Sequence, residues 1–271
     1  MKRAIYIVST LVLFALTACS GVSHVAAPPV PAPMPAPVHV SPSKPVSVIH
    51  RALCVGMADS AFAGACPGAD VDADVFSTLC REQKLQVIQL ADRQCTRSIA
   101  LALLRQAVSI AASNSLLVLF WSGHGGQVAD RNGDEADGLD EYLCPWDRPL
   151  LDDDLAKILD QAQPGVRVFF VCDTCNSGTM ARKALRMPRV VTPRQFKASM
   201  ICFAGCADGK SSFGTAQGGL WTTALIDAWH EGISYRAWFA AAVKRMSGTD
   251  QLPQWTEYGD VSSWADGPAL R

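Results

Sequence analysis

A histidine and a cysteine, two side chains that can act together in nucleophilic catalysis, each follow an apolar run of the sequence. His124 lies just beyond the run at 116–121, and Cys175 lies just beyond the run at 166–171, 51 residues after the histidine. A thiol becomes a good nucleophile as the thiolate, and a neighbouring imidazole can take its proton. If the two runs form adjacent strands, both side chains face one cleft, and the sequence then predicts a cysteine nucleophile with a histidine base.

Glycines surround the histidine in the segment Ser122-Gly123-His124-Gly125-Gly126. They allow tight turns and the close approach of a substrate backbone. We expect the backbone N–H groups of Gly125 and Cys175 to stabilise the oxyanion of an acyl-transfer intermediate. Taken alone, the same two side chains also fit a buried structural cysteine and a histidine that caps a turn.

The elements that would position this pair alternate along the chain from residue 48 onward. Apolar runs typical of strands lie at 50–55, 85–90, 116–121, 166–171 and 200–204. Helices are predicted at 70–81, 96–113 (with Thr96 as the N-cap), 155–163, 220–231 and 235–247. This order predicts an α/β fold with a mostly parallel central sheet, helices on both faces, and functional groups at the carboxyl ends of the strands.

The composition excludes several classes of protein. The chain has 271 residues, of which 49% are hydrophobic and 18% charged, and its net charge is −1. A disordered chain would be less apolar, and a protein that binds nucleic acid through its phosphates would be more basic. We therefore expect one large domain with appendages and no nucleic-acid partner.

The N-terminus has the pattern of an export signal. A Lys-Arg pair precedes the apolar stretch 4–18, which has about the length of a signal-peptide core and is short for a membrane-spanning helix. The stretch ends in Leu16-Thr17-Ala18-Cys19, which resembles the bacterial lipobox. We expect residues 1–18 to be a lipoprotein signal peptide and Cys19 to be lipidated. A plain signal peptide with a chance cysteine is the alternative.

Residues 19–47 form a proline-rich segment. Such a composition favours polyproline II and a semi-rigid tether, although a proline-rich ligand for a partner is the alternative. The expected location is the bacterial cell envelope, anchored to a membrane by lipid, with Ser20 favouring the outer membrane. Export would place the ten cysteines in an oxidising compartment where disulfides persist, but their spacing does not give the pairing.

Several motifs resemble, in their order along the chain, the metacaspases of the caspase-like cysteine peptidases. They are Ser122-Gly123-His124-Gly125, the acidic run 130–141, Leu143-Cys144-Pro145-Trp146-Asp147, the segment 151–155, Asp173-Thr174-Cys175-Asn176-Ser177-Gly178 and Gly205-Cys206-Ala207-Asp208. Caspases also carry the histidine about 50 residues before the cysteine. The resemblance implies a caspase-like three-layer sandwich and a cysteine endopeptidase. We place its domain at residues 48–258, followed by a C-terminal tail at 259–271.

The chain departs from this family pattern at several positions, and the acidic residue often found a little after Asp208 is missing from 211–214. Asn176 stands where the family usually has a histidine after the nucleophile, and Lys210 stands where it usually has a glutamine. The residue after the nucleophile is not the catalytic base, so we expect the chemistry to survive with one supporting hydrogen bond changed.

Two acidic residues indicate the substrate. Asp173 and Asp208 are both expected at strand ends beside Cys175, where their carboxylates would attract a cationic side chain. The resemblance agrees, because metacaspases cleave after Arg or Lys rather than after Asp. The predicted partners are therefore peptides or proteins with Arg or Lys before the cleaved bond. In the alternative, Asp173 caps a turn, and Lys210 pairs with one carboxylate.

The segment 179–207 is basic and has no acidic residue. Its basic residues are Arg182, Lys183, Arg186, Arg189, Arg194 and Lys197. As in many relatives, this segment is predicted to be a loop that the enzyme cuts in itself, and a solvated surface loop is the alternative.

An acidic stretch from Asp130 to Asp154 holds ten acidic residues and two basic ones. Its spacing partly matches an EF-hand, but Glu135 stands where the calcium loop needs glycine, which excludes that motif. The resemblance implies instead an activating calcium site that uses Asp140, Asp152 and Asp153. Arg182 stands near the place where some relatives supply a further ligand, and a solvated acidic loop is the alternative. The chemistry itself requires no cofactor.

A second hypothesis is a catalytically inactive caspase-like scaffold that binds peptides or calcium at the cell envelope. The presence of both His124 and Cys175 favours the enzyme. A thiol-redox role for Cys172-Asp173-Thr174-Cys175 fits poorly, because such a motif normally opens a helix beside a thioredoxin-like strand.

Overall fold

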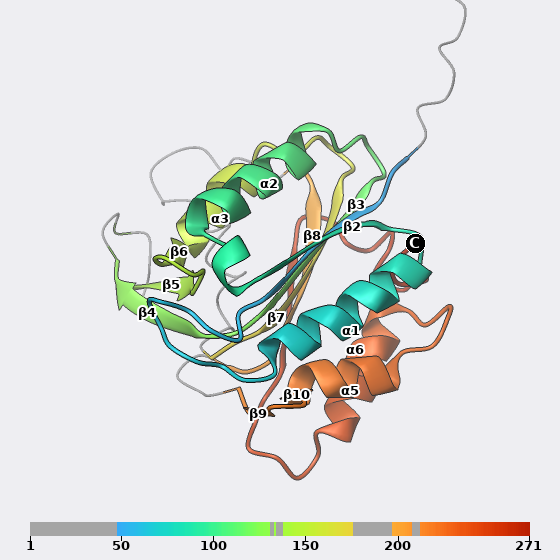
Figure 1. The fold of residues 1–271 in the computed structure, drawn as a ribbon. Coiled ribbons are helices and arrows are strands. Elements are labelled where there is room, and N and C mark those ends of the chain that lie inside the picture. The colour runs from blue at the N-terminus through green and yellow to red at the C-terminus, as the bar shows by residue number, and fades with distance from the viewer. Residues whose placement is uncertain (1–47, 131–132, 134–137, 176–196, 208–211) are drawn as a thin grey trace, which may run out of the picture. The chain divides into compact units, whose positions relative to one another are not determined.

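The structure is a computed structural model that describes residues 48–130, 133, 138–175, 197–207 and 212–271 (Figure 1). The predicted signal peptide, the tether with Cys19, the residues Asn176, Asp208 and Lys210, and most of the basic segment after Cys175 lie outside these ranges. Within the described parts of the chain, no helix has both the length and the apolar character needed to span a membrane.

A six-stranded sheet forms the centre of the domain, in the order β11-β8-β7-β3-β1-β2. Five strands run parallel: β1 (Arg51–Gly56), β2 (Gln86–Ala91), β3 (Leu116–Ser122), β7 (Arg167–Asp173) and β8 (Ser199–Ala204). β11 (Gln254–Tyr258) pairs antiparallel with β8 at one edge. Every residue of β3 is buried, as expected for a parallel strand covered on both faces. The prediction of a mostly parallel sheet is confirmed.

Helices cover both faces of this sheet (Figure 1). α2 (Arg97–Ser109) and α3 (Asp152–Leu159) lie on one face, and α1 (Ala69–Glu82), α5 (Leu220–Ala228) and α6 (Tyr235–Arg245) lie on the other. A short 3-10 helix, η1 (Asp92–Gln94), precedes α2. Thr96 caps α2 as predicted, because its side chain accepts a hydrogen bond from the Ile99 N–H. The three layers confirm the predicted sandwich.

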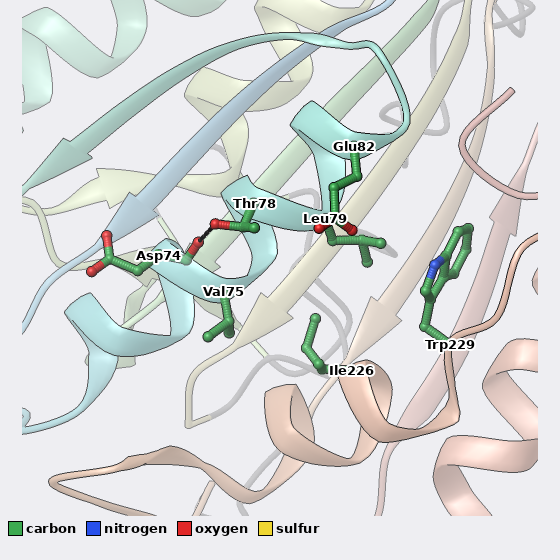
Figure 2. Close-up of a pocket in the computed structure, with 7 residues that line it drawn as sticks. All are labelled: Asp74, Val75, Thr78, Leu79, Glu82, Ile226 and Trp229. Carbon is green, nitrogen blue, oxygen red and sulfur yellow. Dashed lines mark hydrogen bonds between the residues drawn. The ribbon is translucent and has the colours of Figure 1, made fainter.

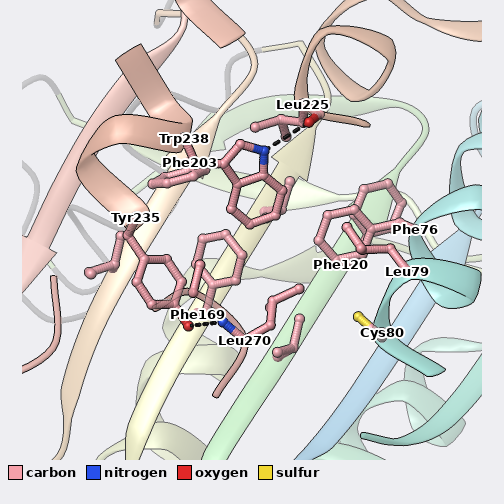
Figure 3. Close-up of a cluster of buried hydrophobic side chains, with 14 of the residues drawn as sticks. Phe76, Leu79, Cys80, Phe120, Phe169, Phe203, Leu225, Tyr235, Trp238 and Leu270 are labelled. Carbon is pink, nitrogen blue, oxygen red and sulfur yellow. Dashed lines mark hydrogen bonds between the residues drawn. The ribbon is translucent and has the colours of Figure 1, made fainter. Parts of the chain in front are cut away.

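An aromatic core joins α1, α5 and α6 to the sheet (Figure 3). Phe76 of α1 stacks on Phe120 of β3 with ring centroids 4.4 Å apart. The buried Trp238 of α6 donates its indole N–H to the Leu225 carbonyl of α5 at 2.8 Å. Large rings contribute most of the apolar area, and their polar atoms add direction. The core therefore fixes where these helices sit above the strands.

The segment 259–271, predicted to be a tail outside the domain, packs into the same core. Trp264 is buried and donates its indole N–H to the Ser199 hydroxyl at 2.9 Å. The buried Leu270 donates its backbone N–H to the Tyr235 hydroxyl at 3.1 Å. The folded core therefore extends past the boundary predicted at 258.

Short strands are the elements that the sequence does not predict. β4 (Gly125–Ala129), β5 (Leu139–Leu143) and β6 (Leu150–Leu151) form a small antiparallel sheet, and β9 (Gly214–Thr215) pairs with β10 (Gly218–Gly219). β6, β9 and β10 have only two residues each, and β4 and β5 are rich in glycine or charge, so none of them shows a clear period-two apolar pattern. α3 also begins three residues before its prediction, because the aspartates of its first turn complement the helix dipole.

We predict that Trp264→Ala lowers the free energy of unfolding by about 3–5 kcal/mol, because it removes a buried ring and leaves the Ser199 hydroxyl without its partner. Urea denaturation followed by circular dichroism measures the change. Leu252→Ala is the control, because that side chain is 54% exposed, and its loss should cost less than about 0.5 kcal/mol. Equal, small effects from both variants would exclude the terminal segment from the core.

Candidate active site

The register of two neighbouring strands brings the predicted catalytic residues to the same edge of the sheet. β3 and β7 are parallel, and Ser122 pairs with Asp173 at their carboxyl ends. His124 and Cys175 each follow two residues after these paired positions. The Gly123 N–H donates to the Asp173 carbonyl at 3.3 Å, which continues the pairing beyond the strand ends. The two loops therefore leave the sheet side by side.

A pocket of about 110 Å³ lies at this edge. His124 and Cys175 both line it, and both side chains are half-buried. The other lining residues are Cys66, Pro67, Ala69, Asp72, Ser122, Gly123, Asp173, Ser212, Phe213, Gly214 and Gly219. A thiol and an imidazole thus line the same solvent-accessible pocket, which is compatible with nucleophilic catalysis.

A second, larger pocket of about 350 Å³ lies between α1 and α5 (Figure 2). Its walls are mainly the apolar side chains of Val75, Leu79, Ile226 and Trp229, with Asp74, Thr78 and Glu82 beside them. It contains neither a thiol nor an imidazole, so the smaller pocket is the candidate for chemistry.

A hydrogen bond fixes the tautomer of the histidine. The Nε2 atom of His124 lies 2.9 Å from the carbonyl oxygen of Ala65, in the loop before α1. A carbonyl only accepts, so Nε2 carries the proton, and in the neutral ring Nδ1 is the nitrogen that accepts one. The ring is thereby held in the form of a general base. Nothing in the sequence around Ala65 indicates this contact.

Glycine is required where the two loops touch. A Cβ atom at Gly125 would lie 2.7 Å from the Cys175 carbonyl oxygen and 2.8 Å from the Thr174 hydroxyl oxygen. The Cys144 N–H donates to the His124 carbonyl at 3.2 Å, and hydrogen-bonded positions alternate along an antiparallel pair. Gly125, the next residue, therefore directs its N–H away from β5. That direction is compatible with the predicted oxyanion role.

Asp173 lies at the floor of the pocket and also holds the start of α5. Its carboxylate accepts hydrogen bonds from the Thr222 N–H at 2.9 Å, from the Thr222 hydroxyl at 2.8 Å, and from the Ser212 hydroxyl. Burial raises the pKa of Asp173, and these hydrogen bonds oppose that rise. Asp173 therefore lies in the pocket, and it also caps backbone and side-chain donors at the start of α5, much as the alternative of a turn-capping residue expects.

Asp72 of α1 is a second buried carboxylate of the pocket, and it is not among the residues predicted from the sequence motifs. It is 2% exposed and accepts hydrogen bonds from the Ser122 hydroxyl at 2.7 Å and from the Gly219 N–H at 2.8 Å. Burial, followed by the charge of Asp173, raises its pKa to about 7. A signal was available: Asp72 shares the buried face of α1 with Phe76 and Leu79, four and seven residues later.

The two carboxylates meet at Gly219. A Cβ atom there would lie 2.3 Å from one Asp173 oxygen and 3.0 Å from one Asp72 oxygen, so the position tolerates no side chain. Among the described residues, neither carboxylate forms an ion pair with a lysine or arginine. These buried carboxylates are stabilised instead by the hydrogen bonds described above.

The predicted calcium ligands are gathered near the hairpin of β5 and β6. Asp140 and Asp152 are buried, and Asp153 forms an ion pair with Lys157 at 2.8 Å. Over the described ranges, no three His, Cys, Asp or Glu side chains are grouped so that they could hold a metal ion.

The cysteines argue against a redox motif. All nine cysteines in the described ranges are free thiols. Cys172 is wholly buried, its pKa is raised by burial, and its sulfur lies 3.2 Å from the Thr174 hydroxyl. A reactive dithiol needs accessible sulfur, so Cys172 and Cys175 do not fit that role. Cys66 does line the pocket, and burial, followed by the charge of Cys175, raises its pKa to about 11.

Comparisons with known proteins agree with this geometry. A family model described as the caspase domain matches residues 49–259. Metacaspase-1 of Cryptococcus neoformans is 34% identical over 155 residues, which are 52% of this chain and 33% of that protein. Metacaspase-1B of Aspergillus oryzae is 32% identical over 156 residues, which are 52% of this chain and 36% of that protein. The chain thus spans about a third of the length of these curated relatives.

Another fungal relative matches over a shorter stretch. Metacaspase-1 of Botryotinia fuckeliana is 40% identical over 102 residues, which are 36% of this chain and 23% of that protein. Among solved structures, protein GSU0716 from Geobacter sulfurreducens is similar, with a TM-score of 0.67 and 29% identity. That similarity covers 78% of this chain and 94% of the other. The fold of the described domain is therefore shared over nearly all of a known structure.

We predict that Asp72→Asn raises the melting temperature at about pH 8, on the order of 5 °C, and changes it little at about pH 5. The raised pKa means that the folded state holds this proton more tightly than the unfolded chain, so Asp72 lowers stability as the pH rises from about 4 to about 7. An asparagine can accept from Gly219 and donate to Ser122.

Scanning calorimetry across this pH range measures the effect. Glu82→Gln, at an exposed acidic residue near the other end of the same helix, is the matched control and should follow the parent profile. Parallel pH profiles for the parent and Asp72→Asn would contradict the burial of an ionisable group at this position.

Proposed function

The chain belongs to the caspase-domain family of peptidases, and we propose that it is a cysteine endopeptidase in which Cys175 is the nucleophile and His124 the base. The observation that carries the proposal is the pocket that these two side chains share, with Nε2 of the histidine bound to a carbonyl. The matched curated relatives are longer proteins, so the substrate preference rests on the chemistry of the site.

The reaction follows from the orientation of the imidazole. Nδ1 of His124 takes the thiol proton of Cys175, and the sulfur attacks the carbonyl carbon of the peptide bond. The tetrahedral intermediate collapses, the carbon–nitrogen bond breaks, and the imidazolium gives its proton to the departing amine. A water molecule deprotonated by the same ring then hydrolyses the thioester and restores the thiol. The Ala65 carbonyl stabilises the imidazolium through Nε2.

The negative charge of the intermediate needs donors in the same hollow. We assign this role to the backbone N–H groups of Gly125 and Cys175. Support comes from the contact between the two segments, since a Cβ atom at Gly125 would reach the Cys175 carbonyl oxygen. Backbone donors that the fold already holds in place need little rearrangement when the charge develops.

The pocket favours a cationic substrate side chain. Asp72 and Asp173 are buried at its floor, and the described residues supply no cation to neutralise them. A lysine ammonium or an arginine guanidinium would enter as the missing partner, and the guanidinium could bind in a bidentate manner. We therefore propose cleavage after Arg or Lys. Asp208, also predicted to bind substrate, lies outside the described residues.

Further elements of the proposal concern regulation and location. We propose that calcium is an activator, held by Asp140, Asp152 and Asp153, and that it takes no part in the chemistry. Self-cleavage in the basic segment after Cys175 and lipid attachment at Cys19, which would place the enzyme in the cell envelope, rest on the sequence.

The inactive scaffold makes a different prediction from the enzyme. A scaffold would bind a peptide with Arg in this pocket and release it intact. An assay of turnover with defined peptides therefore separates the two functions.

We predict that the protein cleaves reporter peptides with Arg or Lys before the scissile bond and leaves peptides with Asp at that place intact. Cys175→Ala abolishes the cleavage. Asp72→Asn lowers kcat/KM for the Arg peptide about tenfold to a hundredfold, because one buried charge is lost. Asp74→Asn, on the same helix but outside this pocket, is the control and should keep the parent value. A preference for the Asp peptide would overturn the proposal.

The affinity for the cation should depend on pH independently of turnover. We predict that acetyl-arginine amide binds the Cys175→Ala variant and that its affinity falls as the pH drops through about 7, because Asp72 becomes protonated. Isothermal calorimetry measures this affinity. Acetyl-citrulline amide, which has nearly the same shape without the charge, should bind weakly at every pH. Equal affinities for the two amides would show that the carboxylates do not select the substrate.

A further inference from the structure

Ser212 and Phe213, which line one wall of the pocket, are bound by a buried side chain almost 40 residues later in the sequence. Gln251 precedes β11 and is 2% exposed. Its Nε2 donates to the Gly205 carbonyl at 2.9 Å and to the Ser212 hydroxyl at 2.8 Å, and its Oε1 accepts from the Phe213 N–H at 3.0 Å. A single amide thus ties the segment 212–213 to the end of β8.

These hydrogen bonds determine the direction in which the Ser212 hydroxyl donates its own proton. Because the amide of Gln251 donates to the oxygen of Ser212, the Ser212 hydroxyl must direct its own proton elsewhere. The acceptor is the carboxylate of Asp173. The chain of donors therefore runs from Gln251 through Ser212 to Asp173, and it ends on the floor of the pocket.

Burial of side chains contributes little to the position of residues 212–213. Phe213 lines the pocket, but its side chain is 49% exposed, so burial of the ring contributes little to its position. Its backbone is held at both ends instead: its N–H donates to Gln251, and its carbonyl accepts from the Leu220 N–H at 2.9 Å. Loss of the Gln251 amide would release one of these two anchors.

We propose that Gln251 is a positioning residue for substrate selection, which orients the Ser212 hydroxyl toward Asp173, fixes Phe213 at the rim, and so keeps the two buried carboxylates arranged for a cationic side chain. This role rests on the proposed preference for Arg or Lys. Gln251 touches neither the nucleophile nor the base in this arrangement, and it acts only through the wall of the pocket.

The electrostatics give this role a measurable signature. The Ser212 hydrogen bond lowers the pKa of Asp173 against the effect of burial. Without that bond, the Asp72–Asp173 pair would take up protons at higher pH, and cation binding would weaken at higher pH as well. The other titratable groups that face this pair are Asp70, Cys66, Cys172, and the pocket residues His124 and Cys175. The proteins compared below share one set of these groups, each without Cys175, so differences between them come from the altered hydrogen bonds.

The test uses the full chain with Cys175→Ala, which prevents turnover and self-cleavage, and acetyl-arginine amide as the ligand. Gln251→Met keeps the size of the side chain and removes its hydrogen bonds. Ser212→Ala removes the next link. Ser199→Ala is the matched control, because it removes a buried hydrogen bond to Trp264 at the other end of β8.

We expect Gln251→Met and Ser212→Ala each to weaken binding about fivefold at neutral pH. Each should also move the midpoint of its pH dependence upward by about half a unit or more. The loss of affinity in the double variant should be close to that of each single variant, because both substitutions break the same chain of hydrogen bonds. Ser199→Ala should keep the parent affinity and midpoint even where it lowers the melting temperature.

The outcomes separate this role from the proposed specificity. A parent protein that does not discriminate the arginine amide from the citrulline amide contradicts the specificity and this role with it. If the parent protein prefers the arginine amide, but Gln251→Met binds that amide with unchanged affinity and an unchanged pH midpoint, the positioning role alone is contradicted. If Gln251→Met does not fold, an unchanged midpoint in Ser212→Ala overturns the role in the same way.

Discussion

The site depends on the in-register pairing of β3 with β7. That pairing sets Ser122 opposite Asp173, so the chain leaves the sheet at the same level in both places and carries a histidine and a cysteine into one hollow. A slip of one residue would turn every side chain of a strand to the other face. The register is secured by burial, because nearly every residue of both strands is covered by a helical layer. The chemistry at the edge is thus fixed by packing in the interior.

The same packed interior buries the carboxylates of Asp72 and Asp173 at the pocket. Two carboxylates are buried there, which costs stability, and hydrogen bonds from Ser122, Thr222, Ser212 and the backbone of Gly219 offset part of that cost. Those donors come from segments distant in sequence, so only the folded domain brings them together. A site that departs locally from the rules of stable cores is typical of functional regions. A cation from a substrate would complete the balance of charge.

The sequence predicts the parts of this arrangement that local patterns encode. The apolar run at 116–121 is typical of a buried strand, and His124 and Cys175 follow two such runs, so the fold class and the neighbouring positions of these two side chains could be inferred from the sequence. The helical spacing of Asp72 with Phe76 and Leu79 indicates its buried face, but its partners Ser122 and Gly219 are brought near it only by the fold. Ala65 and Gln251 act through a backbone carbonyl and an amide in irregular segments, and neither contact has a periodic signature.

The most direct test of the account is the rate at which iodoacetamide alkylates Cys175 at neutral pH, followed by peptide mapping to separate this thiol from Cys66. We expect rapid, selective labelling of Cys175 that falls about tenfold or more in a His124→Ala variant, because Nδ1 no longer takes the thiol proton. Labelling of Cys175 at the same rate in both proteins would contradict the pairing of imidazole and thiol on which the proposed activity rests.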